Sequence, residues 1–259
     1  MEVASDFYTE YARHREQEGR ALRGTALKSL PYLRSGRLAR QWDVRARTFD
    51  AFVSCVVKPF EGSSPLDILD LGAGNGWLSY RMAQRGHRAV ALDIRNDSVD
   101  GLGAAAELVA EAPFDCVGAP FEALPFGRGR FDITLFNASL HYASDLAEVL
   151  GEAVRVTRRG GVLAIMDSPF YRRRSDGEAM IAEKRIQGRT NFGDAADVLL
   201  SPNFIEYLTP QSLVAAVPGL CWKRHRVLYP LWYELRPLLA RLKCARAPSR
   251  FDLWTADIP

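Results

Sequence analysis

Cysteine, net charge and long apolar runs are all scarce in this sequence of 259 residues. The four cysteines (Cys55, Cys116, Cys221 and Cys244) are scattered with no CxxC pair, which argues against a zinc site and against a disulfide framework. We expect them to be small, buried or half-buried residues of a protein in a reducing compartment. No apolar run approaches the ~18 residues that a membrane-spanning helix requires, so no span is predicted.

The charges nearly balance. With 34 Lys and Arg against 31 Asp and Glu, the net charge of +3 is too small to indicate a nucleic acid as partner. The stretch 223–250 is locally cationic, which is typical of a solvated surface helix and would also suit an anionic substrate. The first six residues carry acids where a signal peptide needs a basic flank, so a cytoplasmic protein is predicted.

The pattern of apolar residues predicts an N-terminal helical extension over residues 1–60. The segment up to Arg23 has a mostly polar, helical character. A second, amphipathic helix is expected from Ala46, because apolar side chains then recur at helical spacing up to Val57. Pro59 and the Gly62-Ser63-Ser64-Pro65 cluster are expected to end it.

Short apolar runs alternate with helical patterns in the core, residues 61–167. The runs 66–71, 89–93, 131–136 and 162–167 are strand-like, and an apolar helix over 146–154 with Ser144 as its N-cap lies between the last two. Such alternation predicts an α/β fold, with a doubly wound, mostly parallel sheet covered on both faces.

This rhythm breaks after Asp167. Residues 168–215 are rich in charge and lack strand signals, as expected of a lid insertion. The remainder, 216–259, is expected to complete the core sheet. The expected elements of this tail are a helix over 210–217, a strand near 222–228, a helix over 231–242 and a last strand near 251–256.

The turn after the first predicted strand reads Asp70-Leu71-Gly72-Ala73-Gly74-Asn75-Gly76. Glycines there permit tight backbone conformations and the close approach of a ligand. The GxGxG spacing differs from the GxGxxG of dinucleotide sites. An acid beside a pyrophosphate would be unfavourable, which disfavours a nicotinamide oxidoreductase. Asp70 would instead attract a ligand with a cationic amino group, such as S-adenosylmethionine.

The second predicted strand ends in Asp93, 17 residues beyond Gly76. A carboxylate at this point of an α/β fold accepts hydrogen bonds from a ribose diol. The alternative is an N-cap for the following helix. Ile94 comes next and would offer an apolar face to an adenine ring.

Five motifs in order between Leu66 and Asp167 extend this interpretation. They are Leu69–Gly76, then Leu92-Asp93, then Glu122–Phe126 (EALPF), then Phe131–His141 (FDITLFNASLH), and finally Glu152–Leu163 (EAVRVTRRGGVL). Together they resemble the class I S-adenosylmethionine-dependent methyltransferases, particularly the ubiquinone/menaquinone-biosynthesis type and its small-molecule relatives. The resemblance implies a Rossmann-like, seven-stranded sheet.

The resemblance also implies roles for single residues. Gly72, Ala73 and Gly74 would line the methionine half of the cofactor with Asp70 near its amino group, Asp93 would bind the ribose, and Asn137 would lie beside the transferring methyl. Family members usually carry an acid and a small residue before the EALPF-like stretch. Here these positions are Pro120 and Phe121, so Phe121 stacking on the adenine or Glu122 accepting from its amino group would replace that contact.

Residues beyond the fourth strand limit the acceptor. Amino-methylating DNA enzymes commonly carry an Asn/Asp-Pro-Pro-aromatic motif where this chain has Asn137-Ala138-Ser139-Leu140, so DNA is excluded as a substrate. Methyl transfer is an in-line displacement, and the protein mainly positions the reactants and excludes water. A general base is needed only where the acceptor must lose a proton.

Several side chains are candidates for the acceptor side of the site. His141 is a candidate base or a structural residue closing the pocket, and Tyr142 is expected to pack. Arg172, with the two arginines after it, would clamp an anionic acceptor or form a solvated charge run. Trp42 and Arg45 would fold over the cofactor, with Arg45 on its carboxylate.

The sequence thus predicts a methyltransferase that acts on oxygen or carbon of a small molecule. The alternatives are an RNA or protein methyltransferase that uses the basic C-terminal region, and a catalytically silent module that retains the cofactor fold. Fold alone does not select among acceptors.

Overall fold

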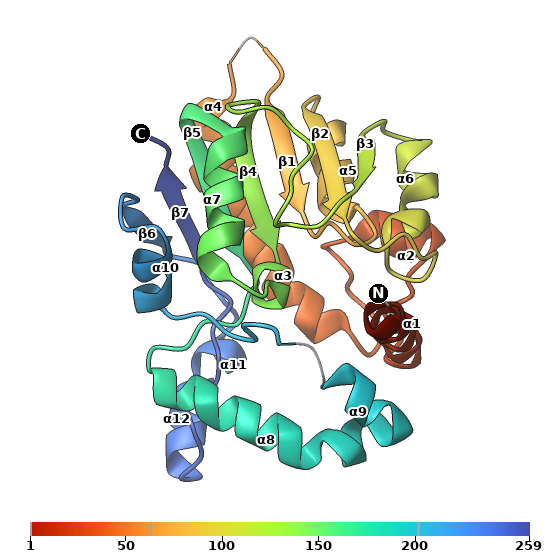
Figure 1. The fold of residues 1–259 in the computed structure, drawn as a ribbon, viewed down its shortest axis with the longest axis vertical. Coiled ribbons are helices and arrows are strands. Elements are labelled where there is room, and N and C mark those ends of the chain that lie inside the picture. The colour runs from red at the N-terminus through yellow and green to blue at the C-terminus, as the bar shows by residue number, and fades with distance from the viewer. Residues whose placement is uncertain (1, 63, 201–202) are drawn as a thin grey trace.

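The computed structural model of the chain describes residues 2–62, 64–200 and 203–259. Met1, Ser63 of the predicted loop, and Ser201 and Pro202 of the predicted lid lie outside the described residues. A seven-stranded sheet forms the centre of the molecule, with helices on both of its faces (Figure 1).

The strands run in the order β3-β2-β1-β4-β5-β7-β6. The first five are parallel, β7 is antiparallel to β5, and β6 is antiparallel to β7. This confirms the predicted doubly wound, mostly parallel fold. The strands are β1 (Asp67–Leu71), β2 (Arg88–Asp93), β3 (Asp115–Gly118), β4 (Phe131–Asn137), β5 (Thr157–Met166), β6 (Trp222–His225) and β7 (Leu253–Asp257).

Helices connect and cover the strands. They are α1 (Glu2–Gln17), α2 (Gly24–Ser29), α3 (Ala39–Phe52), α4 (Lys58–Phe60), α5 (Trp77–Gln84), α6 (Ala106–Val109), α7 (Leu146–Val156), α8 (Arg174–Phe192), α9 (Ala196–Leu199), α10 (Pro210–Ala216), α11 (Leu231–Glu234) and α12 (Arg236–Leu242). A π-helical turn, η1 (Val53–Val57), joins α3 to α4, and short 3-10 turns are η2 (Leu102–Ala105), η3 (Leu140–Tyr142) and η4 (Gly193–Ala195).

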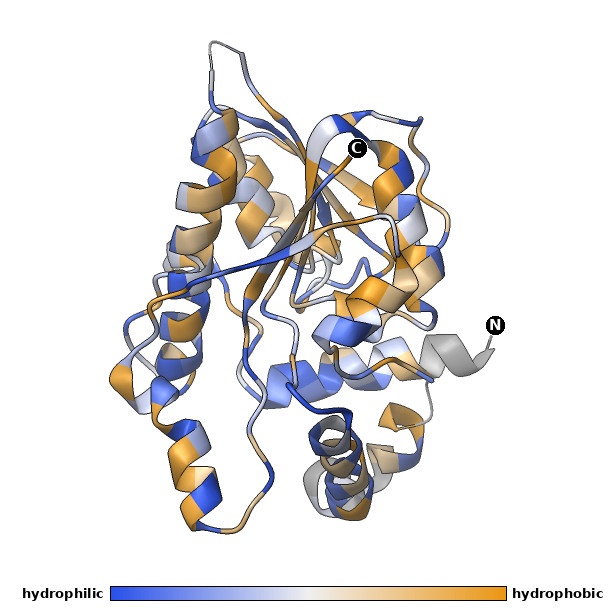
Figure 2. Cartoon of the chain, turned by 90° about the vertical axis from the view of Figure 1, so that its left-hand side faces the viewer, coloured by the Kyte–Doolittle hydropathy of each residue, from blue (hydrophilic) through white to orange (hydrophobic). Residues whose placement is uncertain are grey.

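The two faces of the sheet build two separate cores, because successive residues of a strand point to opposite sides. Ile68 of β1 packs with Phe52 of α3 in one core, whereas Leu69 packs with Val149 of α7 in the other. Viewed from the side, apolar segments line the inward surfaces of these helices (Figure 2). Because the first five strands are parallel, their carboxyl ends lie at the same edge of the sheet. This edge faces α1 and α8 (Figure 1). Among the described residues, no helix is long and apolar enough to cross a bilayer.

Three local expectations were wrong. All four cysteines are exposed rather than buried. Asp145 rather than Ser144 caps α7, because its carboxylate accepts from the backbone N–H groups of Ala147 and Glu148. The helix predicted over 231–242 is interrupted at Leu235. The helix end expected at Pro59 and the 62–65 cluster is confirmed, because α4 ends at Phe60.

One strand escaped prediction altogether. β3 is short, and its residues Asp115 to Gly118 are mostly exposed at the edge of the sheet. It therefore lacks the apolar run that marked the other parallel strands.

Candidate active site

A cavity of about 550 Å³ lies at the carboxyl edge of the sheet. Residues that follow β1, β2, β4 and β5 form its floor, and side chains of α1 and α3 form its opposite wall. Its volume falls within the ~300–1,000 Å³ typical of small-molecule sites.

The glycine turn closes tightly against the neighbouring strand ends. Gly72 has φ 73°, and a Cβ built on it would lie 2.4 Å from the Cβ of Ser139. The backbone N–H groups of Gly72 and Ala73 both donate to the carbonyl of Leu92, at 2.8 and 3.0 Å. Gly74 also has a positive φ, 54°. Only glycine fits at residue 72, because a side chain there would meet both steric and conformational conflict.

Asp93 ties this turn to the end of β2. One carboxylate oxygen accepts from the Gly74 N–H at 2.8 Å, and the other accepts from the Arg95 N–H at 2.8 Å. Burial raises the pKa of Asp93 despite these bonds. Asp93 begins no helix, so the alternative of an N-cap does not apply, and its carboxylate lines the cavity beside Ile94.

Asp70 occupies a different position from the other predicted residues. It is 1% exposed and does not line the cavity, since it lies behind the glycine turn. One of its oxygens accepts from the Ser79 hydroxyl at 3.2 Å, and the other has no partner in the described part of the chain. Burial raises the pKa of Asp70 to about 7.

Arg45 of α3 reaches into the cavity between two strand ends. Its guanidinium donates to Asp167 at 3.2 Å and to Asn137 at 3.3 Å, and lies over the ring of Trp42 at 4.5 Å. Burial lowers the pKa of Arg45, whereas burial raises the pKa of Asp167 to about 6. The resulting wall combines a cation, a carboxylate, an amide and an indole face.

Strained backbone marks the same two strand ends. Ala138 after β4 and Asp167 after β5 have φ values of 56° and 57°, which side-chain-bearing residues seldom adopt. The Ala138 N–H donates to the Met166 carbonyl at 2.8 Å, which holds the two ends together. Such conformations persist where the surrounding structure enforces them, often at functional sites.

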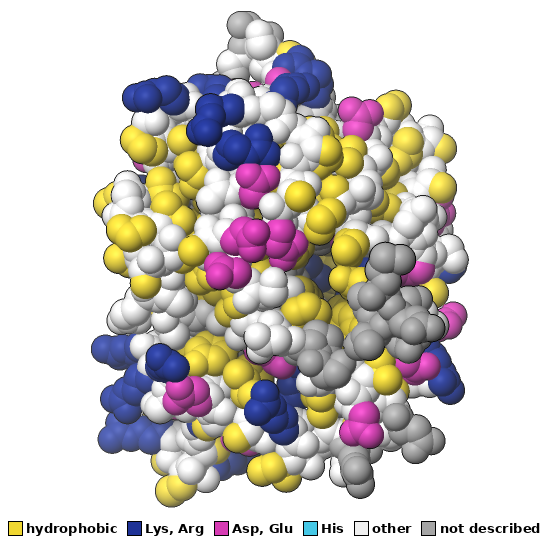
Figure 3. All heavy atoms as spheres, in the orientation of Figure 1, with side chains coloured by type: hydrophobic (Ala, Val, Ile, Leu, Met, Phe, Trp, Pro, Cys, Tyr) yellow, Lys and Arg dark blue, Asp and Glu magenta, His cyan; other side chains and the backbone are white. Residues whose placement is uncertain are grey.

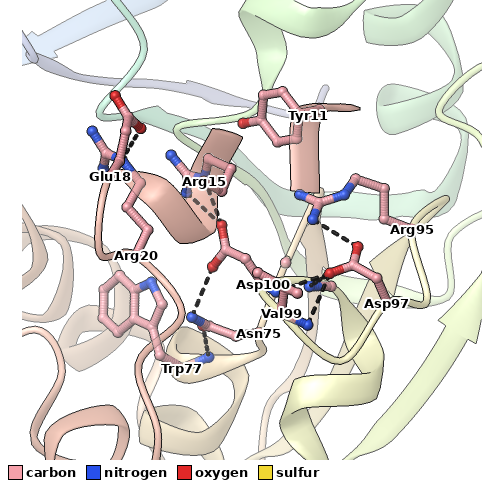
Figure 4. Close-up of polar contacts among 12 residues, drawn as sticks. Tyr11, Arg15, Glu18, Arg20, Asn75, Trp77, Arg95, Asp97, Val99 and Asp100 are labelled. Atoms are coloured by element: carbon pink, nitrogen blue, oxygen red, sulfur yellow. Dashed lines mark hydrogen bonds and ion pairs between the residues drawn. The ribbon is translucent and has the colours of Figure 1, made fainter. Parts of the chain in front are cut away.

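The side chains of α1 that complete the cavity escaped prediction (Figure 4). Arg15 donates twice to Asp100, at 2.7 and 2.5 Å, and Asp100 also accepts from the Asn75 amide at 3.1 Å. Tyr11 contacts the Tyr142 hydroxyl at 2.9 Å. Arg15 and Tyr11 are one turn apart, which was the only available sequence signal for a shared face.

His141, on the 3-10 turn η3, lines the cavity. Burial lowers its pKa to about 3, so the imidazole is neutral near pH 7, and its Nδ1 lies 3.4 Å from the Ser168 hydroxyl. Burial also raises the pKa of Tyr142. Both residues also line a second cavity of about 450 Å³, which extends towards Lys184 of α8 and Arg246.

Most of the predicted residues therefore meet in one cavity. They are Trp42, Arg45, Gly72, Ala73, Gly74, Asp93, Ile94, Phe121, Glu122, Asn137, His141 and Tyr142. Arg172 is exposed and lines neither cavity. The described residues contain no cluster of His, Cys, Asp and Glu that could hold a metal ion.

Comparison with known proteins assigns a domain type to the central part of the chain. Residues 69–165 match the family model described as "Methyltransferase domain". The chain is 30% identical over 129 residues to a malonyl-[acyl-carrier protein] O-methyltransferase of Pseudescherichia vulneris (50% of this chain and 49% of the relative). It is 32% identical over 123 residues to a ubiquinone/menaquinone biosynthesis C-methyltransferase of Rhizobium meliloti (46% of each chain).

Other relatives act on different acceptors. A tRNA 5-carboxymethoxyuridine methyltransferase of Escherichia coli K12 is 32% identical over 112 residues, which are 42% of each chain. The chain spans about half the length of the curated relatives it matches, or less. Its fold is similar to that of the geranyl diphosphate C-methyltransferase from Streptomyces coelicolor A3(2) (TM-score 0.56, 15% identity, 87% of this chain and 85% of the other).

Proposed function

Because the chain carries a class I S-adenosylmethionine-dependent methyltransferase domain, we propose that it transfers the methyl group to oxygen or carbon of a small-molecule acceptor. The cavity at the strand ends carries this proposal. Side chains of α1 and α3 form a wall opposite the strand ends, and a ligand between the two walls is shielded from water on both sides.

The residues of the strand-end wall fit the cofactor. Gly72, Ala73 and Gly74 line the cavity, and a turn without bulky side chains lets a ligand lie close to the backbone. Asp93 has both oxygens oriented by backbone N–H groups, and its remaining lone pairs suit a ribose diol. Phe121 and Ile94 offer apolar faces for an adenine. When bound, S-adenosylmethionine supplies an already activated methyl group.

The second cavity suits the acceptor. It shares His141 and Tyr142 with the main cavity, and Met180, Lys184 and Arg246 enclose its other side. In this proposal the predicted lid, residues 168–215, contributes Met180 and Lys184 to the acceptor site, and the C-terminal segment contributes Arg246. A neutral His141 would accept a hydrogen bond from an acceptor hydroxyl and so orient it towards the methyl.

Likeness to a tRNA methyltransferase favours a second candidate, an RNA acceptor. Phosphate contacts release counterions, so RNA binding would weaken steeply with salt concentration. A small-molecule enzyme should show methyl transfer that depends little on salt.

Calorimetry with S-adenosylmethionine and S-adenosylhomocysteine tests the cofactor assignment. We expect Gly74→Arg to abolish binding and Asp93→Ala to weaken it about tenfold to a hundredfold, since charged hydrogen bonds contribute roughly 1.5–3 kcal/mol. Asp115→Ala, on the exposed strand β3, is the matched control and should bind normally. Binding of a reduced nicotinamide in place of both ligands would refute the proposal. A screen of acceptors with labelled methyl would then identify the substrate.

A further inference from the structure

Seven large apolar side chains lie exposed on and next to α11 and α12. Their exposed fractions are Leu228 70%, Leu231 73%, Trp232 40%, Leu235 40%, Leu238 54%, Leu239 51% and Leu242 73%. Monomeric soluble proteins rarely expose so many neighbouring apolar groups, and such patches mark interaction sites. We refer to these seven residues as the apolar stripe.

The stripe has helical spacing, because its members recur every three or four residues from 228 to 242. A helix of a globular protein normally turns such a stripe towards the core. Here other residues anchor the segment, with Tyr233 only 1% exposed and Tyr229 9% exposed. The Tyr233 hydroxyl accepts from the Phe251 N–H at 2.8 Å. The outward direction of the stripe is thus fixed by contacts on the opposite side of the segment.

Cations flank the stripe along the chain. Residues 222–250 contain eight Lys or Arg, at 223, 224, 226, 236, 241, 243, 246 and 250, and a single acid, Glu234. Three of these cations, Arg224, Arg246 and Arg250, form salt bridges with Asp252, Glu183 and Glu234. Arg241 and Lys243 are exposed and form no salt bridge within the described part of the chain. The lower end of the molecule in Figure 3 shows Lys and Arg side chains among hydrophobic ones, over the region of α8 and α12.

From this combination we infer that the apolar stripe docks on the surface of an anionic lipid bilayer. Outward apolar side chains with flanking Lys and Arg are the arrangement that binds the headgroup region of acidic membranes. Trp232 adds an aromatic side chain of the type enriched at that boundary. Contact is peripheral, since no described helix could span a bilayer.

A second copy of the chain fits this surface less well. A two-fold interface brings the same patch of both subunits together. Here it would bring Arg241 and Lys243 of both copies close together, without an acid of the described residues to pair them, which is electrostatically unfavourable. An acidic bilayer supplies the complementary charge together with an apolar layer to receive the leucines.

Flotation of the full-length protein with vesicles tests the inference and does not depend on methyl transfer. Vesicles of phosphatidylcholine alone are compared with an equal mixture of phosphatidylcholine and phosphatidylglycerol, at low and high salt. We expect binding to the mixed vesicles that high salt weakens. Each cation near an acidic surface contributes roughly fivefold in affinity, so the double variant Arg241→Glu/Lys243→Glu should lose at least about tenfold.

Matched variants separate the stripe from general surface effects. Leu231→Ser/Leu242→Ser should abolish flotation, whereas Val214→Ser, which is 53% exposed on α10, should not. Arg128→Glu/Arg159→Glu reverses two exposed charges near the amino ends of β4 and β5 and should leave binding unchanged. Unchanged circular dichroism melting would establish that each variant is folded.

Three results would overturn the inference. The first is no flotation with mixed vesicles at low salt, and the second is flotation that the leucine variant retains. The third is a dimer in solution that Leu231→Ser/Leu242→Ser dissociates without any vesicle binding, because the stripe would then be a self-association surface.

Discussion

The main cavity has two walls that differ in how they are held. The strand-end wall, with Gly72 and Asp93, is fixed by backbone hydrogen bonds of the glycine turn to the end of β2. In the N-terminal wall, Arg15 of α1 is held by side-chain bonds to Asp100, whereas Arg45 lies on α3, which packs in one of the two cores. The first wall is thus continuous with the sheet, whereas the second is attached to it across long distances in sequence.

This difference indicates which wall can open. Separation of α1 from the sheet requires the loss of a few side-chain bonds, whereas movement of the glycine turn would disrupt the sheet edge. Segments with few buried contacts open at the lowest free-energy cost. We therefore expect ligand entry to depend on α1 and ligand affinity to depend on the strand-end wall.

Gly72→Ala should have the largest effect on stability and cofactor binding together, because it adds a side chain within the strand-end wall. The added Cβ would lie 2.4 Å from that of Ser139, in a backbone conformation with φ 73°. We expect the free energy of unfolding to fall by about 3 kcal/mol and binding of S-adenosylmethionine to be lost. Chemical denaturation and calorimetry would measure both.

Gly86→Ala is the matched control. Gly86 has φ 85°, but no atom lies within 4 Å of its added Cβ. Gly86→Ala should lower the free energy of unfolding by only about 1–2 kcal/mol, because of its positive φ, and should leave cofactor binding normal. Equal losses in the two variants would show that the close approach of Ser139 is unimportant.

Asp70→Asn should change the free energy of unfolding by a similar amount, with the opposite sign and without loss of cofactor binding. Asp70 has a folded pKa of about 7, above its unfolded value, so the folded state retains the proton longer as pH rises. Wild-type stability is then lost between about pH 4 and pH 7. The variant should exceed wild-type stability at pH 8 by up to roughly 4 kcal/mol, and the difference should shrink near pH 4. Thermal melts across this range would measure it.

Asp67→Asn provides the opposite case on the same strand. Arg88 and Arg130 lower the pKa of Asp67, so this carboxylate stabilises the fold above its unfolded pKa. Asp67→Asn should therefore lose stability at pH 8. Cofactor affinity should change little in Asp70→Asn, since Asp70 lies behind the turn, and a large loss would place it in direct contact with the ligand.

The strand-end wall could be predicted from the sequence because its signals are local. The glycine spacing, Asp93 and Asn137 each lie within a few residues of a strand end, and the parallel topology gathers such ends at one edge. The sequence could not predict which of these motif residues would be buried away from the cavity. Asp70 belongs to the same motif, yet its place behind the turn depends on the packing of α5 through Ser79.

The N-terminal wall could not be predicted for a physical reason. Arg15 and Asp100 are 85 residues apart, and neither lies in a motif that specifies the other. Only the tendency of N-terminal segments to cover such cavities predicts Arg45 near the site. Its contacts with Asn137 and Asp167 depend on the angle of α3 against the sheet, which no local pattern encodes.

Arg15→Ala should loosen the N-terminal wall without unfolding the sheet. Loss of two charged hydrogen bonds should reduce the hydrogen-exchange protection of α1 by about tenfold to thirtyfold, equivalent to roughly 2 kcal/mol. The melting temperature of the core should hardly change. Arg13→Ala is the matched control, since that side chain is 68% exposed and reaches only Glu10 on the same helix. Similar protection in both variants would contradict a side-chain attachment of α1.

His141→Gln should have the smallest effect, and it distinguishes positioning from proton transfer at the point where the walls meet. Because the folded pKa of His141 is about 3, its imidazole should not titrate between pH 5 and pH 8 in NMR spectra. Its contribution to stability should be lost as pH falls below its unfolded-state pKa near 6.5, and the variant should lack this loss.

A positioning role predicts that His141→Gln decreases the methyl-transfer rate by less than about tenfold, whereas loss of a general base would decrease the rate by a factor of about 10²–10⁴. His225→Gln on β6, which lines neither cavity, should leave the rate unchanged. A hundredfold decrease confined to His141→Gln would instead make the imidazole the base.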